Sequence, residues 1–382
     1  MIRELGLRNF KAFGHLRLAL APLTLLSGVN AAGKSTTMQA LALLRQSWDA
    51  GLLSSQGGLL LNRDLVELGV GQDVLYEDFD TDERKTPSIE VSLSTDAGEL
   101  AWRVEYQLAR DKEADLLPLS SAPAGPVPDP LFGVGFQYLR ADRIVPAVYY
   151  PKSYDAAVRK GFLGSRGEHT INFLRVRRDD PVPPPLRHQT VRSTSLLDHT
   201  EAWLQELCPG VNIEADDLRG TDLVRLSYGF FGRSGIASSN IRYRPTNVGF
   251  GLTYALPIVV ACLAATPGSL IMLENPEAHL HPRGQSAMAR LACLAAAWGA
   301  QVLVETHSDH VLNGIRLAVK EQVLDSTAVS VHYFRRGAHG TAASPVPPIE
   351  VRSPLLGPDG MLSHWPSGFF DEWDNALDRL LD

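Results

Sequence analysis

One short run restricts the folds open to this chain: residues 28–35 read GVNAAGKS and fit the pattern G-x-x-x-x-G-K-[ST] at every fixed position. Residues 22–27 before it predict a buried strand, and residues 36–45 after it, rich in Ala, Leu, Met and Gln, predict a helix. A glycine loop at a helix N-terminus forms an anion site, because backbone N–H groups curl around a phosphate and the helix dipole adds positive potential. The run therefore predicts a phosphate-binding loop between a strand and a helix.

The loop gives roles to individual side chains. Lys34 would reach the β- and γ-phosphates of a nucleotide, and the Ser35 hydroxyl would join the shell of a Mg²⁺ ion. The alternative is a chance glycine-rich turn, but the complete pattern and its setting favour ATP or GTP with Mg²⁺. The candidate nucleotide-binding residues of this segment are Gly28, Asn30, Gly33, Lys34, Ser35 and Thr36.

Composition sets the outer bounds. The 382 residues allow one large domain or two to three ordinary ones, and 45% apolar with 21% charged residues is typical of a globular chain. The net charge of −7 argues against a protein covered in basic surface, though not against a local basic groove. Three cysteines without C-x-x-C spacing, no signal-peptide pattern and no membrane-length apolar run predict a cytoplasmic protein that does not enter a membrane.

The remaining periodicity predicts an α/β core. Residues 2–10 and 16–20 alternate as strands of a small antiparallel layer, and residues 89–94 and 100–106 predict a hairpin. Buried strands are expected at 136–139, 269–273 and 300–304, and helices at 196–207, 251–265, 282–298 and 309–321. Strands that alternate with helices predict a largely parallel sheet, and the absence of a long heptad run excludes a coiled-coil arm.

Residues 152–192 are locally basic, with nine positive and four negative charges in an acidic chain. Such a stretch could line a groove for DNA or RNA. It could equally be a solvated face, since aromatic residues are sparse in it. Arg143, after the expected strand at 136–139, could face the nucleotide or form an ion pair.

A nucleoside triphosphatase with this loop also needs a carboxylate for Mg²⁺ and a group that orients water. The apolar strand 270–273 ends in Glu274, which suits the Mg²⁺ role, and Glu277 follows. His307 comes just past the next strand, and residues 247–251, NVGFG, open a helix with a glycine turn that predicts a second anion site.

In this order the motifs resemble the ATP-binding-cassette (ABC) ATPases, in the branch of the structural-maintenance-of-chromosomes (SMC), RecF and OLD-type proteins. The chain is most similar to the stand-alone prokaryotic AAA-family ATPases of that branch, which carry a C-terminal element of unknown function. The corresponding segments are a RecF-like opening at 7–13, the Walker A loop at 28–35, a signature motif at 247–251, the Walker B acid Glu274, the turn 276–282, the switch histidine His307 and the tail element at 360–371.

The resemblance implies an ABC-ATPase head: an α/β fold with a mixed or parallel sheet, an N-terminal antiparallel β-layer and an inserted helical lobe. It divides the chain into a Walker A lobe at 1–150, an inserted helical and basic lobe at 151–246, a core with signature, Walker B and switch histidine at 247–335, and a tail element at 336–382.

The resemblance also implies ATP, Mg²⁺ and a homodimer. Each ATP would lie between the Walker motifs of one subunit and the signature loop of the other, where Asn247 and Gly249 would meet the γ-phosphate. Ser35 and Glu274 would hold Mg²⁺, and His307 would sense the γ-phosphate. Proteins of this branch serve DNA repair or anti-phage defence, often beside a separately encoded effector such as a nuclease.

Two residues depart from the family pattern. Asn247 stands where the signature usually has serine, and Asn275 stands where a glutamate usually polarises the attacking water. Because an amide cannot accept a proton as a carboxylate does, three alternatives stay open. Glu277 replaces the missing base, or His307 and Asn275 only orient the water, or hydrolysis is slow and the chain is an ATP-dependent scaffold or sensor. A self-contained nuclease is the remaining function class, but no nuclease motif is evident.

Two further groups of side chains have a structural and a functional interpretation. Glu277, His279 and His281 could bind a metal, but they lie where the dimer-contacting turn is expected, and this turn is the favoured interpretation. The tail contains four aromatic residues that could dock a C-terminal helix on the body or form a patch for a partner: Trp365, Phe369, Phe370 and Trp373.

Overall fold

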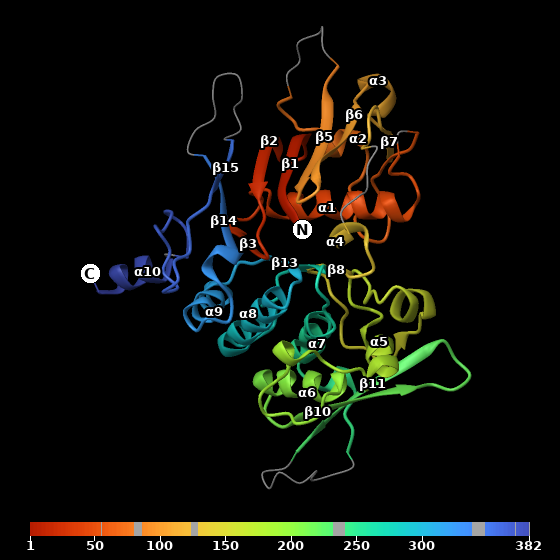
Figure 1. Cartoon of the computed structure of the whole chain (residues 1–382), viewed down its shortest axis with the longest axis vertical. Helices are drawn as coiled ribbons and strands as arrows, with labels where there is room; N and C mark the ends of the chain where they lie inside the picture. The colour runs from red at the N-terminus through yellow and green to blue at the C-terminus, as the bar shows by residue number, and fades with distance from the viewer. Residues whose placement is uncertain are drawn as a thin grey trace. The chain divides into compact units, whose positions relative to one another are not determined.

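The computed structural model describes residues 1–54, 56–79, 86–123, 129–231, 241–337, 348–370 and 372–381. The chain forms two compact units, whose elements are labelled in Figure 1. The first unit comprises residues 1–133, 329–355 and 362–382, and the second comprises residues 134–328 and 356–361. The predicted division into four ranges remains a prediction.

The first unit contains both ends of the sequence. Its strands are β1 (Ile2–Phe10), β2 (Phe13–Ala19), β3 (Leu23–Gly28), β4 (Gly58–Leu60), β5 (Ser88–Thr95), β6 (Gly98–Glu105), β7 (Leu116–Pro118), β14 (Val329–Arg336) and β15 (Ile349–Arg352). Its helices are α1 (Lys34–Asp49), α2 (Gly71–Val74), α3 (Leu108–Asp111), α4 (Asp129–Phe132) and α10 (Glu372–Leu381).

Two sheets organise the first unit. Strands β2, β1, β5 and β6 lie side by side in an antiparallel layer, which confirms the predicted N-terminal layer and hairpin (Figure 1). Strand β3 pairs in parallel with β14, and β14 pairs antiparallel with β15, so this sheet is mixed. Strand β3 is fully buried at Leu23, Leu25 and Leu26, as expected for a strand that leads into a phosphate loop.

The second unit alternates strands and helices. Its strands are β8 (Phe136–Leu139), β9 (Tyr150–Pro151), β10 (Val211–Asp217), β11 (Leu223–Phe230), β12 (Leu270–Glu274) and β13 (Gln301–Glu305). Its α-helices are α5 (Thr170–Arg177), α6 (Leu196–Leu207), α7 (Phe250–Leu263), α8 (Pro282–Ala297) and α9 (Asp309–Lys320). A π-helical turn (Tyr154–Arg159) and three 3₁₀ turns (Pro184–Leu186, Pro245–Asn247 and Ser326–Ala328) complete it.

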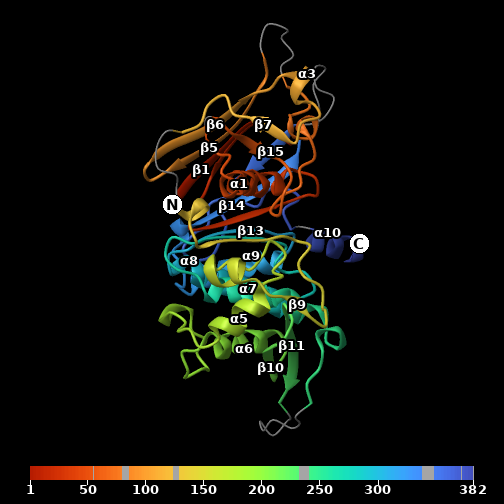
Figure 2. The ribbon, with the colours of Figure 1, turned by 90° about the vertical axis from the view of Figure 1, so that its right-hand side faces the viewer.

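The core of the second unit is parallel. Strand β12 pairs in parallel with β13 on one side and with β8 on the other. Helices α7 and α8 contact these strands, α9 packs on α8, and α6 packs on α7 farther from the strands (Figure 2). The α/β prediction is therefore confirmed, with boundaries within a few residues of those expected.

The inserted segment holds more than helices. Strands β10, β11 and β9 form a three-stranded antiparallel sheet that the sequence patterns did not predict. Strand β10 reads VNIEADD, and its three acidic residues belong to types that are depleted in strands, so its alternation is hard to recognise.

Candidate nucleotide site

The loop of the first unit has the backbone that a phosphate loop needs. Gly28 has a φ of +141°, and a Cβ there would collide with the Phe334 carbonyl of β14. Gly33 has a φ of +85°, and a Cβ there would lie 2.6 Å from the Phe13 ring. Both positions therefore require glycine, because an L side chain meets both a strained φ and a filled space.

Helix α1 begins directly after this loop. Its N-cap is Gly33, which supplies no side-chain hydrogen bond to the first turn. The first N–H groups of a helix lack intrahelical partners, so an α1 start without a side-chain cap is suited to an anion. Of the other predicted loop residues, Asn30 is exposed, Ser35 is half-buried and Thr36 is buried.

Lys34 folds back over the loop. Its side chain is only 4% exposed, and its Nζ donates hydrogen bonds to the carbonyl oxygens of Gly28 (2.9 Å) and Val29 (2.8 Å). The ammonium group is therefore held above the loop, where a lysine of this motif meets phosphate oxygens.

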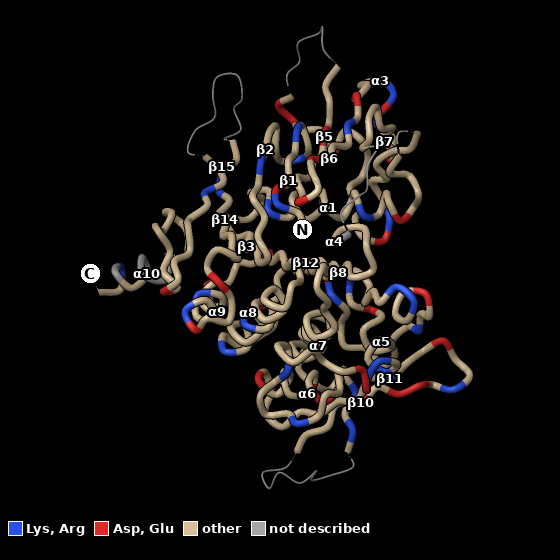
Figure 3. Tube along the Cα trace, in the orientation of Figure 1, with Lys and Arg blue, Asp and Glu red and all other residues tan. Residues whose placement is uncertain are grey.

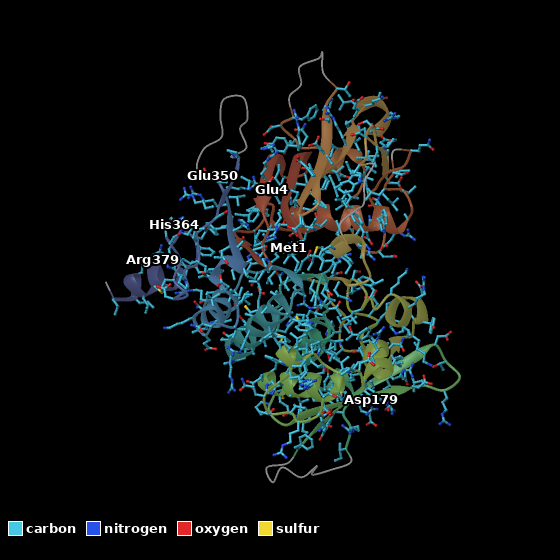
Figure 4. All side chains as sticks on the ribbon, viewed as in Figure 1. Met1, Glu4, Asp179, Glu350, His364 and Arg379 are labelled. Atoms are coloured by element: carbon cyan, nitrogen blue, oxygen red, sulfur yellow. The ribbon has the colours of Figure 1, made fainter. Side chains whose placement is uncertain are left out.

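Arg336 is a loop contact that the sequence analysis missed. It lies at the end of β14, and its Nη2 donates to the carbonyl oxygen of Ala31 at 3.2 Å. The signal that could have found it is a pair of arginines at the end of a strand, since the carboxyl ends of neighbouring parallel strands lie at one edge of a sheet. Its neighbour Arg335 pairs instead with Glu350 on β15, which is labelled in Figure 4.

The second unit places Glu274 at the carboxyl end of β12. Its Oε1 accepts a hydrogen bond from the Tyr138 hydroxyl (2.5 Å), and its Oε2 accepts one from the Ala141 N–H (2.9 Å). Burial, followed by the charge of Glu274, raises the pKa of Tyr138 well above its ordinary value. Tyr138 therefore stays protonated and donates to the carboxylate, a role that the sequence did not reveal.

The other candidate catalytic residues of the second unit lie together. The Glu277 carboxylate accepts a hydrogen bond from the His307 backbone N–H at 2.9 Å, which links the turn after β12 to the segment after β13. Asn275 adopts a left-handed conformation with a φ of +43°. The structure thus brings Glu274, Asn275, Glu277 and His307 to one edge of β12 and β13.

Two oxygens of this cluster are free to bind a metal ion or a water molecule. Asn275 Oδ1 and Glu277 Oε2 are buried and have no hydrogen-bond partner among the described residues. A buried polar atom without a partner is costly, and carboxylate and amide oxygens are ligands for Mg²⁺ and acceptors for water. The donor set therefore fits a hydrated Mg²⁺ ion or an attacking water.

The signature segment lies at the start of α7. Gly249 is the N-cap and gives α7 no side-chain cap, and both Asn247 and Gly249 are exposed. These residues line a pocket of about 650 Å³ together with His279 and His281 of the turn after β12. Within the described residues, no group of three or more His, Cys, Asp and Glu is arranged to hold a metal ion.

Most cations of the basic stretch 152–192 have carboxylate neighbours. Both blue and red segments lie along the trace near α5 (Figure 3). Asp179, labelled in Figure 4, pairs with Arg178. The other pairs are Lys152–Asp217, Arg159–Asp155, Lys160–Asp155, Arg166–Asp142 and Arg177–Asp180. These pairs reduce the positive charge that the stretch can offer to a nucleic acid.

The aromatic tail packs on the first unit. Phe369 is 1% exposed and lies 5.0 Å from the ring of Tyr333 on β14, whose hydroxyl donates to the Gly368 carbonyl at 2.7 Å. Phe370 and the half-exposed Trp365 contact Phe369. Docking of this tail on the body is therefore confirmed up to Phe370, whereas Asp371 and the Trp373 side chain lie outside the described residues.

None of the helices in the described ranges has the length and apolar character needed to cross a membrane. The sequence also matches no curated protein.

The chain is similar to three solved SMC heads. An SMC head bound to the C-winged helix domain of ScpA is 14% identical, covers 93% of this chain and 98% of its own, and has a TM-score of 0.49. The SMC head domain from Thermotoga maritima is 13% identical, with coverages of 91% and 98% and a TM-score of 0.40. An SMC head with an extended coiled coil, bound to the C-terminal domain of ScpA from Pyrococcus furiosus, is 13% identical, with coverages of 100% and 99% and a TM-score of 0.48.

Two family models match the sequence. Residues 171–313 match an "AAA domain, putative AbiEii toxin, Type IV TA system", and residues 324–380 match a "protein of unknown function (DUF3696)". The first match includes residues 247–251, the cluster around Glu274 and His307, but not the loop at 28–35, whose assignment rests on its own sequence pattern and backbone geometry. The chain is therefore similar to an AAA domain over residues 171–313 and to a segment of unknown function over residues 324–380, which supports the resemblance to stand-alone ATPases of the ABC type.

Proposed function

We propose that this protein binds ATP with Mg²⁺ at the loop 28–35 and hydrolyses it as a nucleotide-controlled switch. One observation carries the proposal: a loop of required glycines, with the buried Lys34 ammonium above it, leads into a helix start without a side-chain cap. This combination of backbone donors and one fixed cation recognises the phosphates of a nucleoside triphosphate. The choice of ATP over GTP rests on the family resemblance.

Ser35 and Glu274 are the proposed Mg²⁺ ligands. A bound Mg²⁺ would neutralise charge on the β- and γ-phosphates. Glu277 is the proposed acceptor for the attacking water, because its Oε2 is buried without a partner while its Oε1 is fixed by the His307 N–H. Asn275 would orient the same water through Oδ1. Charge stabilisation and positioning supply most of phosphoryl-transfer catalysis, so turnover does not require a glutamate at position 275.

The switch is proposed to work as a homodimer. The exposed start of α7 at Asn247 and Gly249 offers helix N–H groups to the γ-phosphate bound by a second copy. The matched AAA model is described as a "putative AbiEii toxin, Type IV TA system", which supports a role in defence. The alternative role in DNA repair and the separately encoded effector, such as a nuclease, rest on the family resemblance alone.

Steady-state ATP turnover with Mg²⁺ tests the proposal. Lys34→Ala should lower turnover by about 100-fold or more, because it removes a fixed charge from the developing negative charge. The exposed Lys112→Ala is the matched control and should leave turnover unchanged. Sedimentation with and without ATP measures the dimer in the same samples.

The outcome also decides between the two function classes. Turnover that persists in Lys34→Ala contradicts the proposal. If the wild type does not turn over and only Lys34→Ala loses ATP binding, hydrolysis is refuted and the alternative, an ATP-dependent scaffold or sensor, is supported.

A narrower proposal is nucleic-acid contact through residues 152–192. Since most of its cations are paired, we expect few phosphate contacts and a shallow dependence of affinity on salt. A filter-binding salt titration with DNA and RNA measures this slope, and no binding at low salt contradicts the proposal.

A further inference from the structure

Arg143 is a buried cation that the ATPase roles above do not use. It follows β8 by a few residues, and only 1% of it is exposed. Burial lowers the pKa of its guanidinium to about 10, and the charge of Glu277 opposes this shift. A buried charge is stable only where hydrogen bonds to the protein replace those to water, so the hydrogen-bond acceptors of Arg143 indicate its role.

Those partners are backbone carbonyls of the Walker B turn. Arg143 Nη1 donates to the carbonyl oxygen of Glu274 at 2.6 Å and to that of Arg140 at 3.1 Å, and its Nη2 donates to the carbonyl oxygen of Asn275 at 2.7 Å. Strand β8 pairs with β12 only as far as Leu273. The planar guanidinium therefore takes the place of the strand beyond that point and fixes two successive peptide units at once.

The fixed peptide units include the strained one. Asn275 has a φ of +43°, and its N–H donates to the Glu305 carbonyl of β13 at 2.8 Å. A residue in the left-handed region persists only where its surroundings determine it. Arg143 on one side and β13 on the other hold the backbone of Asn275, and this backbone in turn aims Oδ1.

Arg143 also reaches the signature helix. Its guanidinium lies 5.4 Å from the ring centroid of Tyr254 on α7, and the Tyr254 ring lies edge-on to the His279 ring at 4.8 Å. Helix α7 approaches the same turn closely, since a Cβ on Gly251 would be 2.6 Å from the His279 carbonyl oxygen. These contacts would carry a displacement of the start of α7 to the turn that contains Asn275 and Glu277.

We propose that Arg143 is a positioning residue that clamps the carbonyls of Glu274 and Asn275 and, through Tyr254, couples the signature helix α7 to the water-orienting turn. This inference rests on the proposed ATPase function. It predicts that loss of the clamp lowers the rate of the chemical step and leaves ATP binding at the loop of the first unit intact.

The test compares Arg143→Lys with Arg316→Lys. Lysine keeps the charge but cannot bond two carbonyls in a fork. Arg316 is the control, because it belongs to the same unit and also bonds a backbone carbonyl, but its Nε donates to Gly360 (2.7 Å) and not to the turn after β12. Arg143→Lys should lower kcat by about tenfold or more while the Kd for an ATP analogue changes less than twofold. Arg316→Lys should change neither.

A second measurement does not depend on turnover. Hydrogen exchange of the peptide 274–281 should become at least about tenfold faster in Arg143→Lys than in Arg316→Lys, because the turn loses its fixed acceptor bonds. If Arg143→Lys fails to fold, the Tyr254 pair replaces it: Tyr254→Leu should lower kcat and speed exchange, and Tyr254→Phe should do neither.

The proposed clamp is refuted if hydrogen exchange in 274–281 is unchanged in Arg143→Lys. It is also refuted if the wild type hydrolyses ATP and the kcat of Arg143→Lys stays within twofold of it. A wild type without turnover refutes the proposed hydrolysis, whereas the exchange rates still decide whether Arg143 holds the turn.

Discussion

In the proposed ATPase, residue 275 is expected to set the rate of hydrolysis, and replacing Asn275 by aspartate tests this reasoning most directly. Asp is isosteric with Asn, so it would put a carboxylate oxygen where Oδ1 now lies buried without a partner. It also tolerates the left-handed conformation, with a φ of +43°, that residue 275 adopts. The family's usual glutamate tolerates this conformation less well, and we expect Asn275→Glu to cost about 1–2 kcal/mol of folding free energy.

The expected gain follows from what a general base contributes. A positioned base accelerates a reaction typically about 10²- to 10⁴-fold, but the neighbouring Glu277 already supplies one carboxylate. We therefore expect Asn275→Asp to raise kcat about tenfold, at or below the lower end of that range. Burial and the adjacent acidic groups oppose ionisation of the new carboxyl group, so the gain should appear on going from acidic to neutral pH.

The assay is kcat for ATP from pH 5.5 to 8.5, with thermal unfolding of each variant measured in parallel. Asn275→Asp should fold like the wild type and turn over faster, and Asn275→Glu should turn over faster but unfold more easily. An Asn275→Asp variant with wild-type stability and a kcat within twofold of the wild type at every pH would refute the idea that water activation limits the rate.

Two further predictions concern the loop of the first unit. Gly28→Ala should abolish ATP binding and destabilise the fold by about 2–3 kcal/mol, because the Phe334 carbonyl occupies the place of the new methyl group, as denaturant titration would show. Arg336→Ala should weaken ATP binding about three- to tenfold at low salt and less at high salt, because it removes an exposed cation beside Ala31; fluorescence titration at two ionic strengths measures this.

Each of these loop variants has a control in the same unit. Gly98→Ala replaces another glycine of positive φ, but a Cβ there has no atom within 4 Å, so only the strain is shared with Gly28. Arg335→Ala removes the neighbouring cation of β14, which pairs with Glu350 and does not contact the loop carbonyl. If either control matches its loop variant in ATP affinity, the corresponding explanation is wrong.

The sequence predicts most of the scaffold because its strands and helices are long and regular. The glycine loop follows from residue types at fixed positions. The apolar runs and the helical spacing of apolar residues predict the buried strands β3, β12 and β13 and the helix α6. Strands β10 and β14 were missed for different reasons. Strand β10 carries acidic residues on its half-buried face, and β14 is buried on both faces from Val331 to Phe334, so no polar–apolar alternation marks it.

The contacts of the candidate site are harder to predict from the sequence where backbone atoms make them. The role of Arg143 could not be predicted, because its acceptors are the backbone carbonyls of Glu274 and Asn275. Every residue has such a carbonyl, so the residue type of the acceptor gives no signal. Tyr138 was missed because a tyrosine in a buried strand is usually a core residue, although its hydroxyl donates to Glu274. Asn275 was noticed as a departure, but only its φ gives a physical reason for asparagine there, since asparagine is favoured in the left-handed region.

The C-terminal segment of unknown function contributes a strand beside the one that leads into the loop 28–35. The matched residues 324–380 include all of β14, which pairs in parallel with β3 from Leu23 to Gly28, the strand that leads into the phosphate loop. Without β14, one edge of a fully buried strand would lose its hydrogen bonds, and Gly28 would lose the carbonyl that makes glycine necessary. Tyr333 of β14 is in turn bonded to Gly368 and packed on Phe369 of the tail. The tail, β14 and the loop are therefore packed together, so a partner that moves the tail would act on the strand beside the proposed phosphate site.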